Sequence, residues 1–195
     1  MSKVSTHMTM SLDGYIATAD DAVDELFDWY MAGDNVVETA NPDIGMRVDD
    51  VSATFLTELT GSVGALICGR HLFDVANGWG GTHPVGAPVV VVTHRPPDDA
   101  ETAWPTTTFV HDVASAVERA KEIAGDRDVT IASPTIIQQA LDLGLVDEVC
   151  VSLVPVLFGG GKSYFGALAD GHVLLDDPDV VVGRRATHLR YRVAK

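Results

Sequence analysis

The apolar runs and turn residues along this chain predict strands and helices that alternate. Short unbroken apolar runs bounded by Gly, Pro or polar residues predict buried strands. The runs that meet this description lie at 4–10, 65–68, 88–93, 107–110, 129–131 and 149–157. Apolar residues at helical spacing predict helices at 22–31, 51–60, 113–124 and 134–143, and a short helix that begins near Gly69. The segment 35–50 lacks either period and predicts a loop.

The same pattern predicts the layers of the fold. Strands without alternation are buried on both faces, so helices between them imply a mostly parallel sheet covered on both sides. Two last strands, near 180–182 and 188–193, flank a turn with Gly183 and predict an antiparallel C-terminal hairpin. We therefore expect a three-layer α/β fold with a mixed, mostly parallel sheet. A chain of 195 residues fits one such domain over 1–195.

Composition and charge limit the kinds of partner that we expect for this protein. The net charge is −15, which argues against a nucleic-acid partner because phosphate binding needs basic footprints. The sequence has neither a bilayer-spanning apolar run nor a secretory signal, so we expect a cytoplasmic protein without membrane contact. Cys68 and Cys150 form no CxxC pair and the seven histidines show no ligand spacing. We therefore expect buried free thiols and no metal site.

Three strand ends carry the candidate binding chemistry. In parallel sheets, ligands bind beyond the carboxyl ends of the strands. The three junctions are Gly69-Arg70-His71, Thr93-His94-Arg95 and Ala132-Ser133-Pro134-Thr135. Glycine permits close backbone approach, helix starts offer N–H groups to anions, and guanidinium groups suit phosphates. Together, in an acidic chain, they predict a ligand with several phosphates, such as a dinucleotide.

The sequence does not satisfy two other functional motifs. The segment Gly161-Lys162-Ser163 resembles the end of a phosphate-binding P-loop, but Val156 stands where that motif requires its first glycine. A GxSxG elbow is absent from the sequence, so a hydrolase triad has no anchor. We therefore expect neither a P-loop nucleotidase nor an α/β-hydrolase.

Three stretches resemble the dihydrofolate reductases and, among them, the RibD C-terminal family. Residues 66–95 (LICGRHLF…PVVVVTHR) resemble the reductase pattern of strand, Gly-Arg, short helix and a strand that ends at a 2′-phosphate site. Residues 139–165 (QALDLGLVDE…PVLFGGGKSYF) are similar to the RibD C-terminal pattern, and residues 10–17 (MSLDGYIA) match its S-x-D-G-x-I-A signature. The resemblance covers most of the chain and is weakest at 32–50 and 166–187.

The resemblance implies a reductase that uses NADPH to transfer a hydride to a small pteridine- or pyrimidine-like heterocycle. The cofactor itself carries the hydride chemistry, and the protein sets its geometry. The cofactor-binding residues that it implies are Gly69, Arg70 and His71 at the phosphates, Thr93, His94 and Arg95 at the adenosine 2′-phosphate, Ala132, Ser133, Pro134, Thr135 and Ile136 along the pyrophosphate, and Thr9, Ile16 and Ala17 beside the nicotinamide.

The resemblance also suggests candidates at the substrate. Asp28 is the candidate catalytic carboxylate, which would bind an amidine-like edge or help to deliver the proton; the alternative is a solvated acid on an acidic helix. Asp13 is a second candidate near the ring, with a turn-shaping role as the alternative. Trp29 is the candidate substrate-binding residue, and its alternative place is the core.

Two departures from the family pattern keep other functions open. The chain has Ala132-Ser133 where the family has Gly-Gly, and two added Cβ atoms would crowd the pyrophosphate. Leu72 stands where dihydrofolate reductases carry a threonine that contacts the cofactor. The alternatives are the pyrimidine reductase of the riboflavin pathway, and a non-catalytic small-molecule-binding member that has lost NADPH binding. We also expect a homodimer, because relatives commonly pair and the apolar C-terminal strands offer a self-complementary edge.

Overall fold

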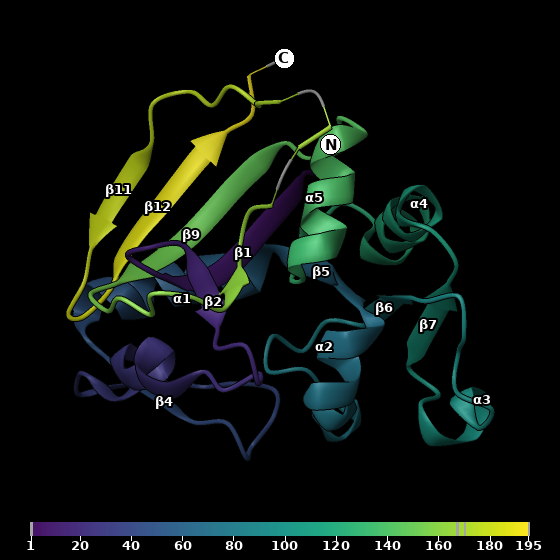
Figure 1. The fold of residues 1–195 in the computed structure, drawn as a ribbon. Helices are drawn as coiled ribbons and strands as arrows, with labels where there is room; N and C mark the ends of the chain where they lie inside the picture. The colour runs from purple at the N-terminus through teal and green to yellow at the C-terminus, as the bar shows by residue number, and fades with distance from the viewer. Residues whose placement is uncertain (1, 167, 170, 195) are drawn as a thin grey trace.

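An eight-stranded sheet forms the frame of the protein (Figure 1). The computed structural model describes residues 2–166, 168–169 and 171–194, so the two ends of the expected domain, at 1 and 195, lie outside the described residues. The strands of the sheet are β1 (Val4–Ser11), β5 (Val63–Gly69), β6 (Val89–Val92), β7 (Thr107–Val110), β8 (Asp128–Ile131), β9 (Glu148–Val154), β11 (Asp179–Val182) and β12 (Thr187–Arg192). Their order across the sheet is β11-β12-β9-β1-β8-β5-β6-β7.

The pairing confirms the predicted sheet. The six strands from β9 to β7 in this order pair in parallel, whereas β12 pairs antiparallel with both β9 and β11. The sheet is therefore mixed and mostly parallel, with an antiparallel C-terminal hairpin. Because β8, β5 and β6 are parallel neighbours, their carboxyl ends lie at one edge of the sheet.

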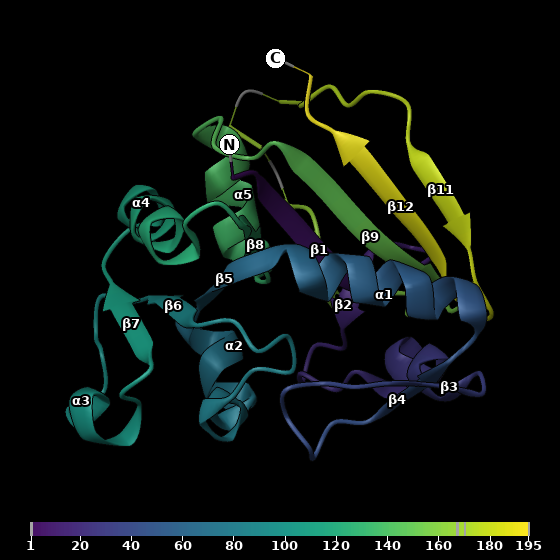
Figure 2. The same ribbon diagram turned by 180° about the vertical axis from the view of Figure 1, so that it is seen from behind.

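Helices cover both faces, as predicted (Figures 1 and 2). On one face, α4 (Val113–Ala124) and α5 (Pro134–Asp142) bury their apolar sides in the largest core. On the other face, α1 (Asp50–Ser62) packs with Leu26 and Trp29 in a second core. The short α2 (Arg70–Val75) buries Phe73 in a third cluster, over β5 and β6.

The structure departs from the predicted elements at several short segments. The expected helix over 22–31 is a 3-10 helix, η1 (Asp24–Met31), whose buried Leu26 and Trp29 are three residues apart and so share one side of a three-residue turn. The expected loop 35–50 contains a hairpin of β3 (Asn35–Val37) and β4 (Met46–Val48). These strands are too short to show a period. The further short elements are β2 (Tyr15–Ala17), η2 (Asn77–Gly81), α3 (Ala100–Ala103) and β10 (Lys162–Ser163).

Both cysteines are buried free thiols, as expected. Burial raises the pKa of Cys68 to about 12 and that of Cys150 to about 11, so neither is a thiolate at neutral pH. Within the described part of the chain, no helix has the length and apolarity needed to cross a bilayer.

Candidate cofactor and substrate site

The structure brings the three predicted strand-end junctions together. The N–H of Gly69, the last residue of β5, donates to Oγ of Ser133, the residue that precedes α5, over 2.9 Å. The Arg70 Nη1 donates to the carbonyl oxygen of Arg95, after β6, over 2.6 Å. The junctions of β8, β5 and β6 are thus directly bonded to one another and form one surface, which we term the phosphate edge.

Cationic and polar side chains line the phosphate edge. Arg70 is held by an ion pair of its Nε with Oδ1 of Asp74 at 2.7 Å. The hydroxyl of Thr93 accepts the Arg95 N–H at 3.1 Å and so shapes the turn after β6. The exposed Arg95 side chain forms no ion pair with the residues that the structure describes, and the neighbouring His94 ring lies beside His111. The Arg95 guanidinium is therefore available to an anionic ligand.

Ser133 replaces a glycine of the family pattern and acts as a tie between elements. Its side chain does not cap α5; it accepts the Gly69 N–H instead. Pro134 occupies the first turn of the helix, where it has no N–H to offer. Ile136 is buried beside Gly69. The hydroxyl of Ser133 therefore takes a backbone donor that would otherwise face an anion at this edge.

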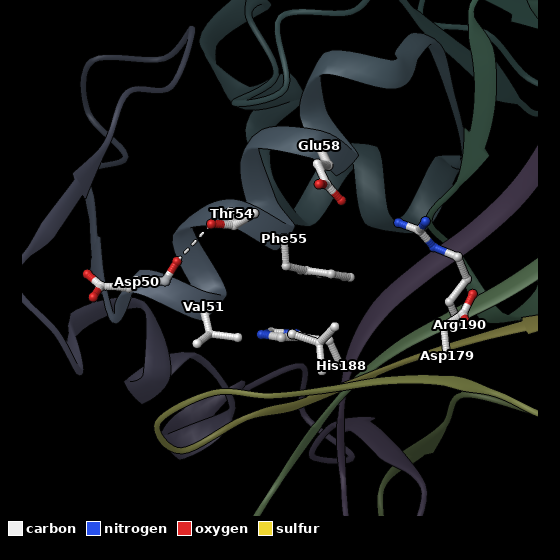
Figure 3. A pocket seen from close by; sticks show the side chains of 9 residues that line it. Asp50, Val51, Thr54, Phe55, Glu58, Asp179, His188 and Arg190 are labelled. Carbon is white, nitrogen blue, oxygen red and sulfur yellow. Dashed lines mark hydrogen bonds between the residues drawn. The ribbon is translucent and has the colours of Figure 1, made fainter.

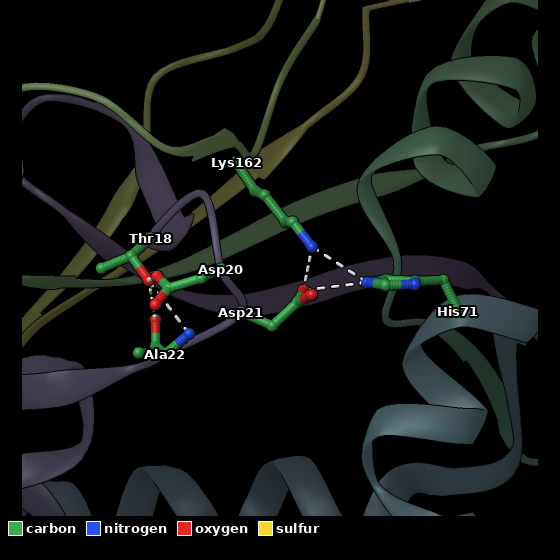
Figure 4. A network of polar contacts seen from close by, with 6 residues as sticks. All are labelled: Thr18, Asp20, Asp21, Ala22, His71 and Lys162. Atoms are coloured by element: carbon green, nitrogen blue, oxygen red, sulfur yellow. Dashed lines mark hydrogen bonds and ion pairs between the residues drawn. The ribbon is translucent and has the colours of Figure 1, made fainter.

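A second group of charges lies beside the first junction (Figure 4). Oδ1 of Asp21 accepts a hydrogen bond from the Lys162 ammonium and lies 2.9 Å from Nε2 of His71. Nζ of Lys162 and Nε2 of His71 are 2.9 Å apart. The bonds from Lys162 and His71 lower the pKa of Asp21, so its carboxylate is anionic. We term this group the Asp21 latch, because it joins three separate segments of the chain.

A glycine makes the Asp21 latch possible. Gly161 has a φ of +140°, and a Cβ there would lie 2.2 Å from the carbonyl oxygen of Ala17. Only glycine lets this loop approach β2 so closely that β10 pairs with it. Lys162, the next residue, is thereby placed opposite His71. The sequence gives no separate signal for this role, since Gly161-Lys162-Ser163 resembles only the end of a P-loop motif.

A cavity of about 410 Å³ adjoins the phosphate edge. Two residues of the edge region line it: Leu72, which follows His71 in sequence, and Ala132, the first residue of the third junction. Thr9 lines the cavity as well and accepts a hydrogen bond from the Trp29 indole over 3.3 Å. The lining residues are His7, Met8, Thr9, Phe27, Tyr30, Ile44, Met46, Leu56, Leu59, Thr60, Val63, Leu66, Leu72, Trp79, His83, Pro84, Val85, Thr130 and Ala132.

The titratable groups that line the cavity are uncharged at neutral pH. Burial lowers the pKa of His7 to about 3 and that of His83 to about 4. Burial also raises the pKa of Tyr30 to about 12. In each case the cause is loss of water around the charged form. The cavity therefore suits a neutral, largely apolar ring with a few hydrogen-bonding groups.

The candidate substrate residues lie away from the cavity wall. Asp28 is exposed and its Oδ2 lies 3.8 Å from Nη2 of Arg185. The carboxylate of Asp13 accepts from the Ser11 hydroxyl at 2.6 Å and from two backbone N–H groups after β9, which is the turn-shaping arrangement. Trp29 is 1% exposed and belongs to the core, although its neighbours Phe27 and Tyr30 line the cavity.

The two remaining candidates for the nicotinamide lie on β2. Ile16 packs against the main core and Ala17 is buried. Lys162 of β10 pairs with Ala17, so β2 connects the Asp21 latch to the region of β1. Neither residue is among the described residues that line the cavity.

Comparison with known proteins gives the family. The model of the RibD C-terminal domain family matches residues 2–182. A search of curated proteins finds no match. A solved structure from Shewanella sp. PV-4, named "Putative riboflavin biosynthesis protein", is 23% identical with a TM-score of 0.72, and 99% of each chain is covered.

Two further solved structures share the fold at lower identity. Acinetobacter baumannii RibD is 17% identical with a TM-score of 0.66; the whole of this chain is covered, but it spans only 58% of that protein. The Saccharomyces cerevisiae riboflavin biosynthesis reductase Rib7 is 13% identical with a TM-score of 0.61, and 99% of this chain and 90% of that chain are covered. With a dihydrofolate reductase-like fold and a family match over almost its whole length, the chain belongs to the RibD C-terminal domain family.

Proposed function

We propose that this chain is a reductase that uses NADPH to transfer a hydride to a small pteridine- or pyrimidine-like heterocycle. The observation that carries the proposal is that the phosphate edge and the apolar cavity are contiguous, through Leu72 and Ala132. A dinucleotide with its phosphates at the edge would extend its far ring towards the cavity. The cavity volume of about 410 Å³ suits a small ring system.

The residues at the edge fit the charge of this cofactor. Arg95 with Thr93 would hold the 2′-phosphate, and Arg70, His71 and Lys162 would hold the pyrophosphate. The Asp21 carboxylate between Lys162 and His71 supports this assignment, because an anionic oxygen already lies between the two donors. When bound, NADPH supplies a hydride; the protein's part is to align the ring with the substrate carbon and to exclude water.

We propose, more specifically, that the substrate is a pyrimidine of the riboflavin pathway. Membership of the RibD C-terminal domain family and the similarity to the Acinetobacter RibD and Saccharomyces Rib7 structures support it. The uncharged cavity is consistent with a neutral heterocycle, and Thr9, Thr60 and Thr130 offer hydroxyls to its polar atoms.

Titration with NADPH and NADH, followed by nucleotide fluorescence and by Tm, tests the proposal. NADPH should bind more tightly than NADH, and Arg95→Ala should weaken NADPH binding about tenfold through loss of a charge-assisted bond, with little effect on NADH. Arg119→Ala is the matched control, since Arg119 lies on α4 and, within the part of the chain that the structure describes, forms an ion pair with Glu122 alone. Equal affinities for NADPH and NADH, unchanged in Arg95→Ala, would contradict the assignment.

One observation favours a second function, a binding module without hydride transfer. The Gly69 N–H is bonded to Ser133 and so is unavailable to a phosphate. If this tie blocks the cofactor, the protein will show no Tm shift at millimolar NADPH, and Ser133→Gly will restore binding. If the reductase proposal holds, the unmodified protein binds NADPH and Ser133→Gly improves that binding only slightly.

A further inference from the structure

A continuous line of hydrogen bonds crosses the sheet from the start of α1 to the cavity. Oδ2 of Asp49 accepts from the Ser52 hydroxyl at 2.8 Å, and Oγ of Ser52 lies 3.1 Å from Nε2 of His188. Oγ of Ser152 then lies 2.9 Å from Nδ1 of His188 and 2.9 Å from Nε2 of His7. We term this line the Asp49–His7 chain. It ends in the cavity, because His7 lines the cavity wall.

The fold holds the middle of this chain firmly. Ser52, Ser152 and His188 are 0%, 0% and 1% exposed. His188 lies directly opposite Ser152 in the pairing of β12 with β9, and the Phe55 ring of α1 stacks on His188 with centroids 4.0 Å apart. Each imidazole nitrogen of His188 therefore has one fixed partner.

Charged groups lie beside the middle of the Asp49–His7 chain. A groove of about 530 Å³ between α1 and the C-terminal strands reaches His188 (Figure 3). The charged residues that line it are Asp50, Glu58, Asp179 and Arg190. At the inner end, the charged or titratable neighbours that influence His7 are His188 and Arg190.

The chemistry of these groups fixes the direction of every bond. Although burial favours its neutral form, Asp49 has a lowered pKa because the Arg184 N–H and Ser52 donate to it, so it is an ionised acceptor. Ser52 gives its proton to Asp49 and must accept from Nε2–H of His188. Burial lowers the pKa of His188 to about 4, so at neutral pH its Nδ1 carries no proton and accepts from Ser152.

The last link follows in the same way. The Ser152 hydroxyl donates its proton to Nδ1 of His188, so its oxygen accepts a hydrogen bond from Nε2–H of His7. Burial lowers the pKa of His7 to about 3, so its other nitrogen, Nδ1, is unprotonated. Among the described residues no fully buried side-chain nitrogen or oxygen lacks a partner, and no bond to Nδ1 of His7 is formed, so Nδ1 keeps accessible surface; the cavity is the space that His7 lines.

We infer that the Asp49–His7 chain holds His7 as a neutral imidazole whose bare Nδ1 accepts a hydrogen bond from the ligand in the cavity. The ligand must therefore carry an N–H or O–H donor there, such as a ring lactam N–H, an amino group or a sugar hydroxyl. The inference rests on the proposed function only in taking the cavity as the substrate site. It also means that His7 does not supply the proton for reduction at neutral pH.

Nitrogen-15 NMR of the protein without ligand tests the direction of the hydrogen bonds in the Asp49–His7 chain. At pH 7, His7 and His188 should both be neutral Nε2–H tautomers, with no protonation down to about pH 5. Ser52→Ala cuts the link to Asp49 and should give mixed tautomers at His188. Ser115→Ala is the matched control, because the Ser115 hydroxyl donates to Asp112, the N-cap residue of α4, in the same way but bonds to no histidine among the described residues. A charged His7, an Nδ1–H tautomer, or an unchanged His188 in Ser52→Ala would overturn the inference.

A pair of probes tests the acceptor itself. Lumazine carries ring N–H donors, and 1,3-dimethyllumazine does not. Lumazine should shift the Nδ1 resonance of His7 and bind about tenfold more tightly than its dimethyl form, since the latter leaves Nδ1 unpaired. Ser152→Ala should reduce this preference. Failure of lumazine to perturb Nδ1, or equal binding of both probes, would overturn the acceptor role. Failure of NADPH binding with intact tautomers and an intact preference would instead overturn the reductase proposal.

Discussion

Single side chains set the balance of charge at the phosphate edge. In a chain of net charge −15, the phosphate edge and the adjoining Asp21 latch together carry Arg70, Arg95 and Lys162. The Asp21 carboxylate occupies the space between Lys162 and His71, and a phosphate that entered there would have to displace it. Because these side chains are partly exposed, solvent screens each of these contacts.

Asp21→Asn should therefore strengthen NADPH binding. The substitution removes the competing charge but keeps the size of the side chain, and we expect a roughly threefold lower Kd. Asp20→Asn is the matched control, since Asp20 bonds to the Thr18 hydroxyl and does not join the latch. Fluorescence titration measures both variants. Weaker binding in Asp21→Asn would show that Asp21 assists the cofactor site and does not compete for it.

At the scale of elements, the strand ends were predictable from the sequence and the strand interiors were not. Unbroken apolar runs such as Val89–Val92 identify buried strands, and parallel pairing then places their carboxyl ends together. His7 lies within β1 and Ser152 within β9. Neither strand shows a regular alternation of polar and apolar residues, so a polar residue there gives no signal in the sequence. Their bond joins residues 145 positions apart, which only the register of the sheet brings into contact.

The sequence likewise does not show which of the candidate substrate residues face the interior. Asp28 and Trp29 are adjacent in η1, and the turn of the helix decides which of them faces inward. Trp29 is buried and Asp28 is exposed, so the carboxylate lies outside the cavity wall. The sequence predicted an α-helix there, and a 3-10 turn changes the facing of each residue.

The buried imidazoles between the elements should make stability fall in acid. The pKa of His7 is about 3 and those of His83 and His188 are about 4, below the ordinary 6.5. Between pH 6.5 and about 4, the unfolded chain binds protons that the folded chain rejects, so each histidine contributes a loss of up to about 1.4 kcal/mol per pH unit.

Urea unfolding at pH 7.5, 6.5 and 5.5 measures this loss. Through these three histidines, the free energy of unfolding should fall slightly between pH 7.5 and 6.5 and about three times as much between pH 6.5 and 5.5. His188→Gln should reduce the slope, whereas His111→Gln, at an exposed position, should leave it unchanged. Equal slopes in the two variants would mean that His188 is charged in the folded protein.

At the scale of the whole molecule, the β11 edge of the sheet exposes apolar side chains. β11 is the outermost strand, and Val180 and Val182 on it are 52% and 70% exposed. An edge strand of this kind offers unpaired backbone groups and apolar side chains to another strand. We propose that two copies of the chain pair along β11.

Analytical ultracentrifugation checks this pairing. We expect a dimer that Val182→Lys converts to a monomer, because a buried lysine at the edge disfavours association. Val75→Lys, on α2 and also exposed, is the control and should leave the dimer intact. A single species of 20.7 kDa at all concentrations would contradict the proposal.

The central claim is that the phosphate edge and the cavity form one continuous site, and amide chemical shifts measured during titration test it most directly. Adenosine 2′,5′-bisphosphate should perturb the edge at Arg70, Arg95 and Ser133 and leave the cavity unchanged. NADPH should perturb the same edge residues and also Thr9 and Leu72 on the cavity wall. If NADPH perturbs the edge alone, or neither region, the two are separate and the proposed reductase site is wrong.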